Sequence, residues 1–150
     1  MKGVYALVIF IPDDIDVRIG ALGTQRFEAS KWVYIGSAFG NGSTSLEHRI
    51  RRHFSREKKL HWHIDLLMEV TGPPTRVIWS ESERKRECEI ANKLGQHADF
   101  IEGPKGFGSS DCKAKCGTHL FKHNGRNTWK TIQQLFEAMG LEPHSLEDLS

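Results

Sequence analysis

The sequence predicts one α/β or α+β domain built around a small sheet. The chain has 150 residues, a length typical of a single domain with its own core. Apolar residues make up 38% and charged residues 27%, the balance of an ordinary globular protein. Short β-rich segments alternate with segments whose apolar residues recur at helical spacing. We place the domain at residues 1–140 and expect residues 141–150 to form a loose, acidic C-terminal tail.

Two long strands are expected in the first quarter of the chain. Residues 3–11 are almost continuously apolar and β-branched, which predicts a strand covered on both faces. Residues 31–36 predict a second strand, ended by a loop of small residues. Shorter strands are predicted at 17–19, 75–79 and 119–122.

Four helices are expected between and after these strands. The first runs to about Phe54 and is capped by Ser45 or one of the two residues before it. Residues 61–70 fit a helix or a strand, and we favour a helix. The last helix covers 128–139 and stops at Gly140.

The third helix is predicted from a local signature. Ser80 is followed three residues later by Glu83, the spacing of a capping box, so we expect a helix from Ser80 to about Leu94.

Composition excludes several classes of protein. No apolar run approaches the roughly 20 residues of a membrane-spanning helix. The apolar stretch at 4–11 stops at Pro12 without a small-residue cleavage site, so we expect a cytoplasmic protein that does not contact a membrane. The net charge is only +2, with a pI near 8.5. A hypothesis of nucleic-acid binding therefore depends on where the charges lie.

The two tyrosines of the chain each lie in a predicted strand beside a glycine. The motifs are Gly3-Val4-Tyr5 and Tyr34-Ile35-Gly36. Taken alone, such tyrosines are typical of ordinary strands, because tyrosine favours sheets and its hydroxyl readily finds a partner. Their meaning depends on the charged residues that follow.

Positive charge is concentrated between residues 46 and 59. On the predicted helix, an apolar stripe recurs every fourth residue from Leu46, and Arg49 and His53 lie on its flank. Arg51 and Arg52 are expected to face water. The remaining cations follow the helix: Arg56, Lys58 and Lys59. Two interpretations stay open, a solvated charged face or a phosphate-binding edge, since guanidinium groups match phosphate oxygens.

Glu87 falls in the middle of the apolar face of the helix predicted over residues 80–94, beside Ile90, Ala91 and Leu94. A carboxylate that faces a core is costly unless it is paired or binds a metal. Two interpretations stay open: a salt bridge to Arg49 or another arginine, or a single-carboxylate site for Mg²⁺ or Mn²⁺. Such ions keep several waters and accept substrate phosphate as a further ligand.

Histidines and cysteines supply further candidates. His61 and His63 flank Trp62, so they share a face on a strand but not on a helix. With Asp65 they belong either to the active edge or to hydrogen bonds inside the core.

The three cysteines cannot pair completely, which argues against a secreted disulfide scaffold. Cys88 stands alone in the sequence. A second group has the donor types of a zinc site: Cys112, Cys116, His119 and His123. Structural zinc, a local disulfide and reduced thiols are the alternatives for this group.

With these residues in hand, the chain resembles the GIY-YIG nuclease superfamily. The match consists of both tyrosine motifs, the pair Arg49 and His53, and Glu87 on a later helix. It looks closest to the branch catalogued as domain of unknown function 123, through strings that extend to about Phe121. These strings are Gly20-x-Leu22-Gly23 and residues 61–65, 87–91 and 106–112.

The resemblance implies a small, mainly antiparallel central sheet flanked by helices. It also implies metal-dependent hydrolysis of phosphodiester bonds in DNA. Members of the branch are sometimes attached to a DNA-repair glycosylase, which implies a role in repair and a repair protein as a partner.

The resemblance also implies roles for single residues. Tyr5 or Tyr34 would help to activate the attacking water, and Arg49 would stabilise charge on the phosphate. Glu87 would hold Mg²⁺ or Mn²⁺, and His53 would lie beside the scissile phosphate. The residues expected to contact nucleic acid are Gly36, Ser37, Arg51, Arg52, Lys58, Lys59, His61 and His63.

Two features depart from the superfamily pattern. The tyrosine motifs are farther apart than in the superfamily core, although the branch shares that insert. No asparagine follows the glutamate helix in a matching context, and Asp111 is the candidate replacement.

Three functions therefore compete. They are a DNA nuclease, a non-catalytic nucleic-acid-binding module, and a protein-interaction domain in which Glu87 and Arg49 form an internal ion pair.

Overall fold

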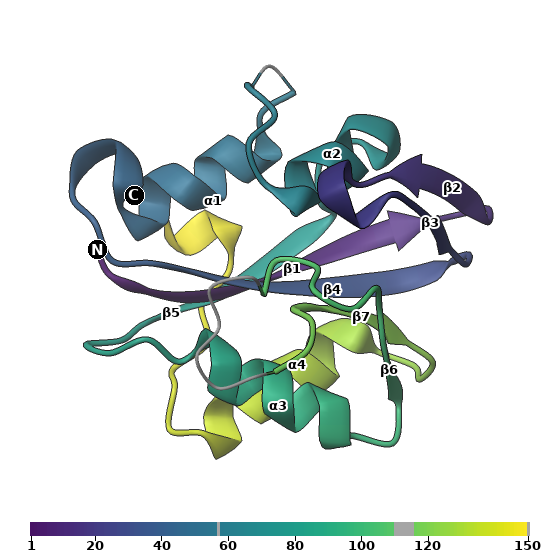
Figure 1. Ribbon diagram of the computed structural model, residues 1–150. Helices are drawn as coiled ribbons and strands as arrows, with labels where there is room; N and C mark the ends of the chain where they lie inside the picture. Colours follow the sequence, from purple (N-terminus) through teal and green to yellow (C-terminus); the bar gives the residue numbers. More distant parts are fainter. Residues whose placement is uncertain (57, 110–115, 150) are drawn as a thin grey trace.

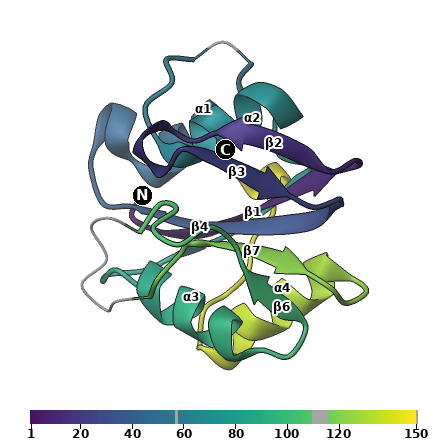
Figure 2. The ribbon, with the colours of Figure 1, turned by 45° about the vertical axis from the view of Figure 1, so that its right-hand side comes forward.

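A five-stranded antiparallel sheet forms the centre of the protein, with strand order β5-β1-β4-β7-β6. The computed structural model describes residues 1–56, 58–109 and 116–149. Helices α1 and α2 and a separate β2–β3 hairpin lie on one face of the sheet, and α3 and α4 lie on the other (Figures 1 and 2). The predicted class, a small antiparallel sheet flanked by helices, is confirmed.

The elements have the following bounds. The strands are β1 Gly3–Ile11, β2 Ile15–Arg18, β3 Thr24–Phe27, β4 Ser30–Ala38, β5 Arg76–Glu81, β6 Phe100–Glu102 and β7 Leu120–His123. The α-helices are α1 Leu46–Phe54, α2 His63–Thr71, α3 Glu87–Gln96 and α4 Thr128–Ala138. The short 3₁₀ helices are η1 Gly20–Leu22, η2 Gly42–Thr44 and η3 Leu146–Asp148.

Strand β1 is covered on both faces, as its continuous apolar run predicts. It pairs with β4 on one side and β5 on the other, and every residue except Phe10 is buried. Its side chains alternate between two cores. Tyr5, Leu7 and Ile9 belong to the core under α1 and α2. Val4 and Ala6 belong to the core under α3 and α4.

Helix α1 begins where the capping residues predict. The Ser45 hydroxyl accepts a hydrogen bond from the backbone N–H of His48 at 3.4 Å, which satisfies one free donor of the first turn. Leu46 and Ile50 are fully buried, so the predicted apolar stripe faces the sheet. Residues 63–71 form helix α2, the favoured of the two alternatives for that segment.

The predicted start of the third helix is wrong. Ser80 lies inside strand β5, where it pairs with Val4, and Glu83 is exposed in the turn that follows. Helix α3 begins only at Glu87. The capping-box spacing is a local signal, and pairing with a strand 76 residues earlier in the chain overrides it. The buried face of Ile90, Ala91 and Leu94 is as predicted.

The segment after Gly140 is packed rather than loose. Leu141 is buried, and His144 forms an antiparallel bridge with Trp79 on the outer edge of β5. The Trp79 indole N–H donates to the Ser145 carbonyl at 2.7 Å. Leu149 packs against the core that contains Tyr5. The expected loose tail is therefore a cover for an edge strand.

Candidate functional site

The two tyrosines lie on neighbouring strands and on the same face of the sheet. Tyr5 is opposite Gly36 in the β1–β4 register, and Tyr34 is opposite Leu7. The tyrosines are therefore diagonal neighbours, within reach of each other across the strands. A Cβ atom at Gly36 would lie 2.5 Å from the Tyr5 hydroxyl oxygen. The glycine of the second motif is thus required because the ring of the first motif lies across it.

His53 of helix α1 packs against both tyrosines. Its Nε2 atom lies 2.7 Å from the Tyr5 hydroxyl oxygen, and its ring centroid lies 6.4 Å from that of Tyr34. His53 is fully buried, and its Nδ1 atom has no hydrogen-bond partner among the described residues. Burial lowers the pKa of His53 to about 3, so its ring is neutral at physiological pH.

The tyrosines are also uncharged. Burial raises the pKa of Tyr5 well above its usual value, and Tyr34 adds to this effect while Arg49 opposes it. Burial likewise raises the pKa of Tyr34, with smaller contributions from Asp65 and Glu87. Both phenols therefore keep their protons at neutral pH.

Arg49 lies one helical turn before His53 and supplies a positive charge at the site. Its Nη1 atom donates to the Ser37 carbonyl at 2.6 Å. Its guanidinium carbon lies 5.0 Å from the centroid of the Trp62 ring. The sequence motif places Ser37 just after Gly36, so this hydrogen bond ties the arginine helix directly to the second tyrosine motif.

Arg52 does not face water as predicted. It makes two hydrogen bonds to the carboxylate of Asp65, both at 2.9 Å, and its guanidinium carbon lies 4.4 Å from the Trp62 ring centroid. Asp65 also accepts the backbone N–H groups of His61 and Trp62. This fully buried carboxylate thus joins α1 to the start of α2, where the Trp62 ring contacts the guanidinium groups of Arg49 and Arg52.

Opposing effects act on the pKa of Asp65. Burial raises it, but the hydrogen bonds from Arg52 and from the two backbone N–H groups outweigh burial and hold the pKa below its usual value. Asp65 therefore stays ionised at neutral pH.

A glycine-rich loop covers Tyr34. Gly108 adopts a φ of +67°, and a Cβ atom there would lie 2.8 Å from Cε1 of Tyr34. Its backbone N–H donates to Nδ1 of His63 at 2.9 Å, which leaves Nε2 as the protonated nitrogen of a neutral His63. The Phe107 ring is fully buried against Tyr34 and His63. Tyr5, Tyr34 and His53 form a group of packed side chains, here called the tyrosine cluster. His63 therefore packs, through Phe107, at the side of this cluster.

Glu87 is the first residue of α3, and its Oε2 atom is buried without a hydrogen-bond partner among the described residues. No ion pair between Glu87 and Arg49 is present in the part of the chain that the structure describes. This outcome removes the basis of the internal-ion-pair hypothesis. Glu87 contributes to the raised pKa of Tyr34, after the larger effects of burial and Asp65, and it opposes the effect of burial on the pKa of His119.

The remaining predicted nucleic-acid contacts differ in exposure. Arg51, Lys59 and His61 are exposed. Lys58 is half-buried and donates to the Ser55 carbonyl at 2.7 Å, and burial lowers its pKa. The ammonium group of Lys58 therefore already has a hydrogen-bond partner within the protein.

The predicted zinc group is assembled differently. Cys112 and Asp111 lie outside the described residues. Cys116, His119 and Cys88 come together instead, with ligand atoms within 4.8 Å of one another. Cys88 therefore does not stand alone. Its α3 position carries it to the segment before β7, a proximity that spacing within residues 112–123 could not reveal.

His123 is not part of this group. Residues 119 and 123 are four positions apart on extended chain, which separates them by about 13 Å. His123 packs on Phe100, and its Nδ1 atom lies 2.6 Å from the Thr128 hydroxyl oxygen. Its predicted role as a zinc ligand is wrong.

The three assembled residues can hold a metal ion by the type of their donor atoms. They supply three of the four ligands that a structural zinc requires. Cys88 and Cys116 are, however, disulfide-bonded. Zinc binds thiolates, so the reduced form of the two cysteines would act as ligands together with His119.

Sequence patterns alone missed Trp62 and Phe107 as parts of the site, whereas Asp65 was already a candidate. Each lies in a string that supports the resemblance to the domain 123 branch, and that was the signal available for them. Within residues 1–56, 58–109 and 116–149, every helix is too short or too polar to cross a membrane.

Comparison with known proteins identifies a family. No curated protein and no solved structure matched the chain. A family model described as Domain of unknown function DUF123 matches residues 4–141, a range that includes Tyr5, Tyr34, Arg49 and Glu87. Because this match covers most of the 150 residues, the chain belongs to the family of Domain of unknown function DUF123.

Proposed function

We propose that the protein is a divalent-metal-dependent nuclease that hydrolyses phosphodiester bonds in DNA, in keeping with its resemblance to the GIY-YIG superfamily. The observation that carries the proposal is the buried Oε2 atom of Glu87, which has no hydrogen-bond partner among the described residues. A role in DNA repair is part of the same proposal and follows from the resemblance.

The donor chemistry of Glu87 suits Mg²⁺ or Mn²⁺. Burying a carboxylate oxygen without a partner is costly, and a hard cation is the ligand that offsets this cost best. Glu87 would hold the ion, with water and substrate phosphate as its other ligands. When bound, the ion supplies positive charge next to the phosphate oxygens.

Arg49 is suited to the other side of the phosphate. Its guanidinium has five N–H donors, and one donates to the Ser37 carbonyl. The others can donate to phosphate oxygens as negative charge develops there. The Trp62 ring and the Ser37 carbonyl hold the guanidinium before substrate arrives, so little reorganisation is needed.

Tyr5 and His53 provide a path for the proton of the attacking water. Burial disfavours both a tyrosinate and an imidazolium, so a stepwise loss of the Tyr5 proton is unfavourable. A concerted transfer would avoid the tyrosinate: Tyr5 accepts a proton from water while its own proton crosses the hydrogen bond to Nε2 of His53, whose heavy atoms are 2.7 Å apart. The imidazolium formed in this way is short-lived, and its proton returns through Tyr5 to solvent. The water oxygen bonds to phosphorus, the bond to one sugar oxygen breaks, and that oxygen takes a proton from solvent water.

The test is cleavage of labelled DNA in Mg²⁺ or Mn²⁺, with duplex, flapped and branched substrates. We expect Glu87→Ala to abolish cleavage and to leave DNA binding intact. Glu89→Ala is the matched control, because Glu89 lies on the same helix but forms ion pairs with Arg84 and Arg86. Absence of cleavage by the wild-type protein on all substrates and metals would sink the proposal, as would full activity of Glu87→Ala.

A second candidate is a nucleic-acid-binding module without catalysis. The observation that favours it is the burial of the tyrosines, since Tyr5 is only 3% exposed and Tyr34 only 8%. In this case the exposed cations Arg51 and Lys59 would bind phosphates, and no metal would be required. Arg51→Ala/Lys59→Ala should then lower the dependence of DNA affinity on salt, while no variant or metal produces cleavage.

A further inference from the structure

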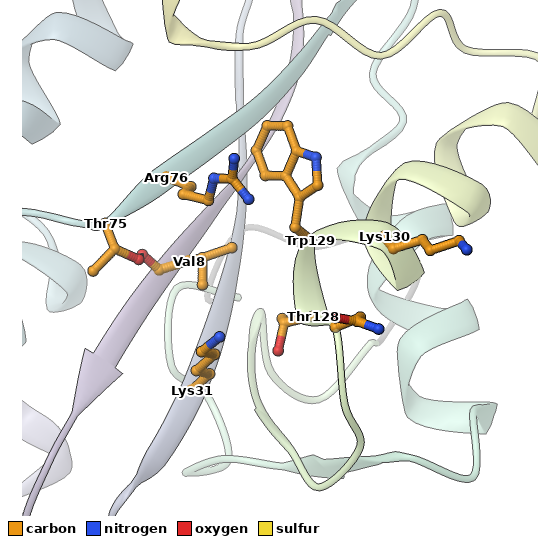
Figure 3. A pocket seen from close by; sticks show the side chains of 8 residues that line it. Val8, Lys31, Thr75, Arg76, Thr128, Trp129 and Lys130 are labelled. Atoms are coloured by element: carbon orange, nitrogen blue, oxygen red, sulfur yellow. The ribbon is translucent and has the colours of Figure 1, made fainter.

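A polar pocket lies on the opposite face of the sheet from the tyrosines. It has a volume of about 290 Å³. Its walls come from β1, β4, β5 and the start of α4 (Figure 3), and the lining residues are Val8, Lys31, Thr75, Arg76, Asn127, Thr128, Trp129 and Lys130. Val8 and Tyr5 are three positions apart on one strand, so their side chains point to opposite faces. The pocket is therefore separate from the proposed nuclease site.

Three cations from three different elements meet in this pocket: Lys31 of β4, Arg76 of β5 and Lys130 of α4. None of them forms an ion pair with a carboxylate in the described ranges. Some basic residues of other surfaces do contact an acid, as Arg26, Arg84 and Lys122 show. The pocket thus gathers positive charge that the fold leaves uncompensated.

Arg76 is held in place by an aromatic ring. Its guanidinium carbon lies 4.0 Å from the centroid of the Trp129 ring, and the two side chains face each other in Figure 3. This contact orients the guanidinium without using its N–H donors, which make no hydrogen bond to another described residue and can donate to an oxyanion. The exposed carboxylate of Glu147 has its pKa lowered by Ser145 and, less strongly, by Arg76, but it forms no ion pair with Arg76 in the described chain.

We propose that this pocket binds a phosphate group in the backbone of a nucleic-acid strand. The cations match the charge of a phosphodiester, and a guanidinium fork matches its oxygens. The exposure of Lys31, Arg76 and Lys130 favours a strand over a small ligand, because small-molecule sites bury most of their ligand. The site requires no hydrolysis and stands whether or not the proposed nuclease activity is real.

The test is an NMR titration in EDTA, which prevents metal-dependent cleavage. Three probes are compared at equal phosphate concentration: a short single-stranded oligonucleotide, a mononucleotide and inorganic phosphate. We expect the oligonucleotide to shift the backbone amide signals of Thr128, Trp129 and Lys130 most strongly. Equal shifts with the mononucleotide would assign the pocket to a free phosphate ester and overturn the assignment to a strand.

A pair of variants tests the contribution of the cations. Lys31→Ala/Arg76→Gln should weaken oligonucleotide binding and reduce its salt dependence by about 0.7 in log–log slope for each phosphate that the protein no longer neutralises. Arg18→Gln/Lys93→Ala removes the same charge from exposed positions outside the pocket and is the matched control. Equal losses in both double variants, or unmoved α4 amides with all three probes, would overturn the proposal. Cleavage assays on the same variants report separately on the nuclease site.

Discussion

The Tyr5 hydroxyl oxygen and Nε2 of His53 lie 2.7 Å apart, across an interface between a strand and a helix that are 48 residues apart in the chain. Both side chains are buried, so each satisfies a polar atom that water cannot reach. This hydrogen bond belongs equally to the stability of the fold and to the proposed chemistry. The two contributions can be measured apart.

Removing the Tyr5 hydroxyl should lower stability more than removing that of Tyr34. Tyr5→Phe leaves both ring nitrogens of His53 buried without a partner, which costs about 1–3 kcal/mol. Tyr34→Phe is the comparison, because the described residues give its hydroxyl no hydrogen bond. Urea unfolding of both variants measures the difference. Equal losses would mean that the Tyr5–His53 bond contributes little.

Stability should fall as the pH is lowered from about 6.5 towards 3. The pKa of His53 is about 3 in the folded protein because of burial, whereas the unfolded chain has an ordinary histidine pKa near 6.5. Between these values the unfolded state binds more protons, so its free energy drops relative to the native state as pH falls. The slope contributed by one such histidine reaches about 1.4 kcal/mol per pH unit.

His119 and His123 also have pKa values lowered chiefly by burial and act in the same direction. Urea unfolding of the wild-type protein and of His53→Gln at pH 7, 6 and 5 separates the contribution of His53. We expect a shallower dependence on pH in the variant. The same slope in both proteins would exclude His53 as the titrating group.

Asp65→Asn should destabilise the protein by about 3–5 kcal/mol, because it leaves the Arg52 guanidinium without its buried counter-charge. The control is Asp16→Asn, which breaks an exposed ion pair with Arg26 and should cost less than about 1 kcal/mol. Chemical denaturation distinguishes the two outcomes. If both substitutions cost the same, the Asp65 carboxylate does not organise the site as the geometry indicates.

Gly36→Ala should be destabilising by about 1–3 kcal/mol, since its new methyl group would overlap the Tyr5 ring and force it to move. Gly95→Ala on helix α3 provides the contrast. There the nearest atom is the mobile end of Glu102 at 3.1 Å, and alanine is the better helix former, so no loss is expected. Thermal unfolding of the two variants decides the matter, and a tolerated Gly36→Ala would contradict the observed packing.

Mn²⁺ should raise the thermal unfolding temperature of the wild-type protein, because an ion that binds only the folded state stabilises it by mass action. Glu87→Gln should abolish this shift, since the amide keeps the shape of the side chain but loses its charge. Glu89→Gln should retain the shift. A shift that survives in Glu87→Gln would place the ion elsewhere.

Patterns that depend on neighbouring residues predicted much of the fold. The apolar run of β1 and the Ser45 cap with the stripe of Leu46 and Ile50 on α1 gave element type and approximate limits correctly. The start of α3 failed because the pairing of Ser80 with Val4 depends on a distant strand. The sequence did not predict strands β3 and β6, because segments of four and three residues are too short to show a clear alternation of apolar and polar side chains.

The candidate site shows the same contrast between residues that a local motif identifies and residues whose position depends on a distant contact. Tyr5, Tyr34 and His53 were singled out from motifs, and the sheet register brings them together. Arg52 was assigned to solvent because its partner Asp65 lies on another helix, 13 residues later. Cys88 was set aside because only the packing of α3 beside the segment before β7 brings it to Cys116 and His119.

The bridge between Trp79 and His144 has a practical consequence for anyone who shortens this chain. The family match ends at residue 141, yet the residues beyond it shield the outer edge of β5. An uncovered edge strand offers unpaired N–H and carbonyl groups as a template for intermolecular sheet formation. We therefore expect a fragment that ends at residue 141 to self-associate. A fragment that stays monomeric should extend at least to Leu149, which packs on the core.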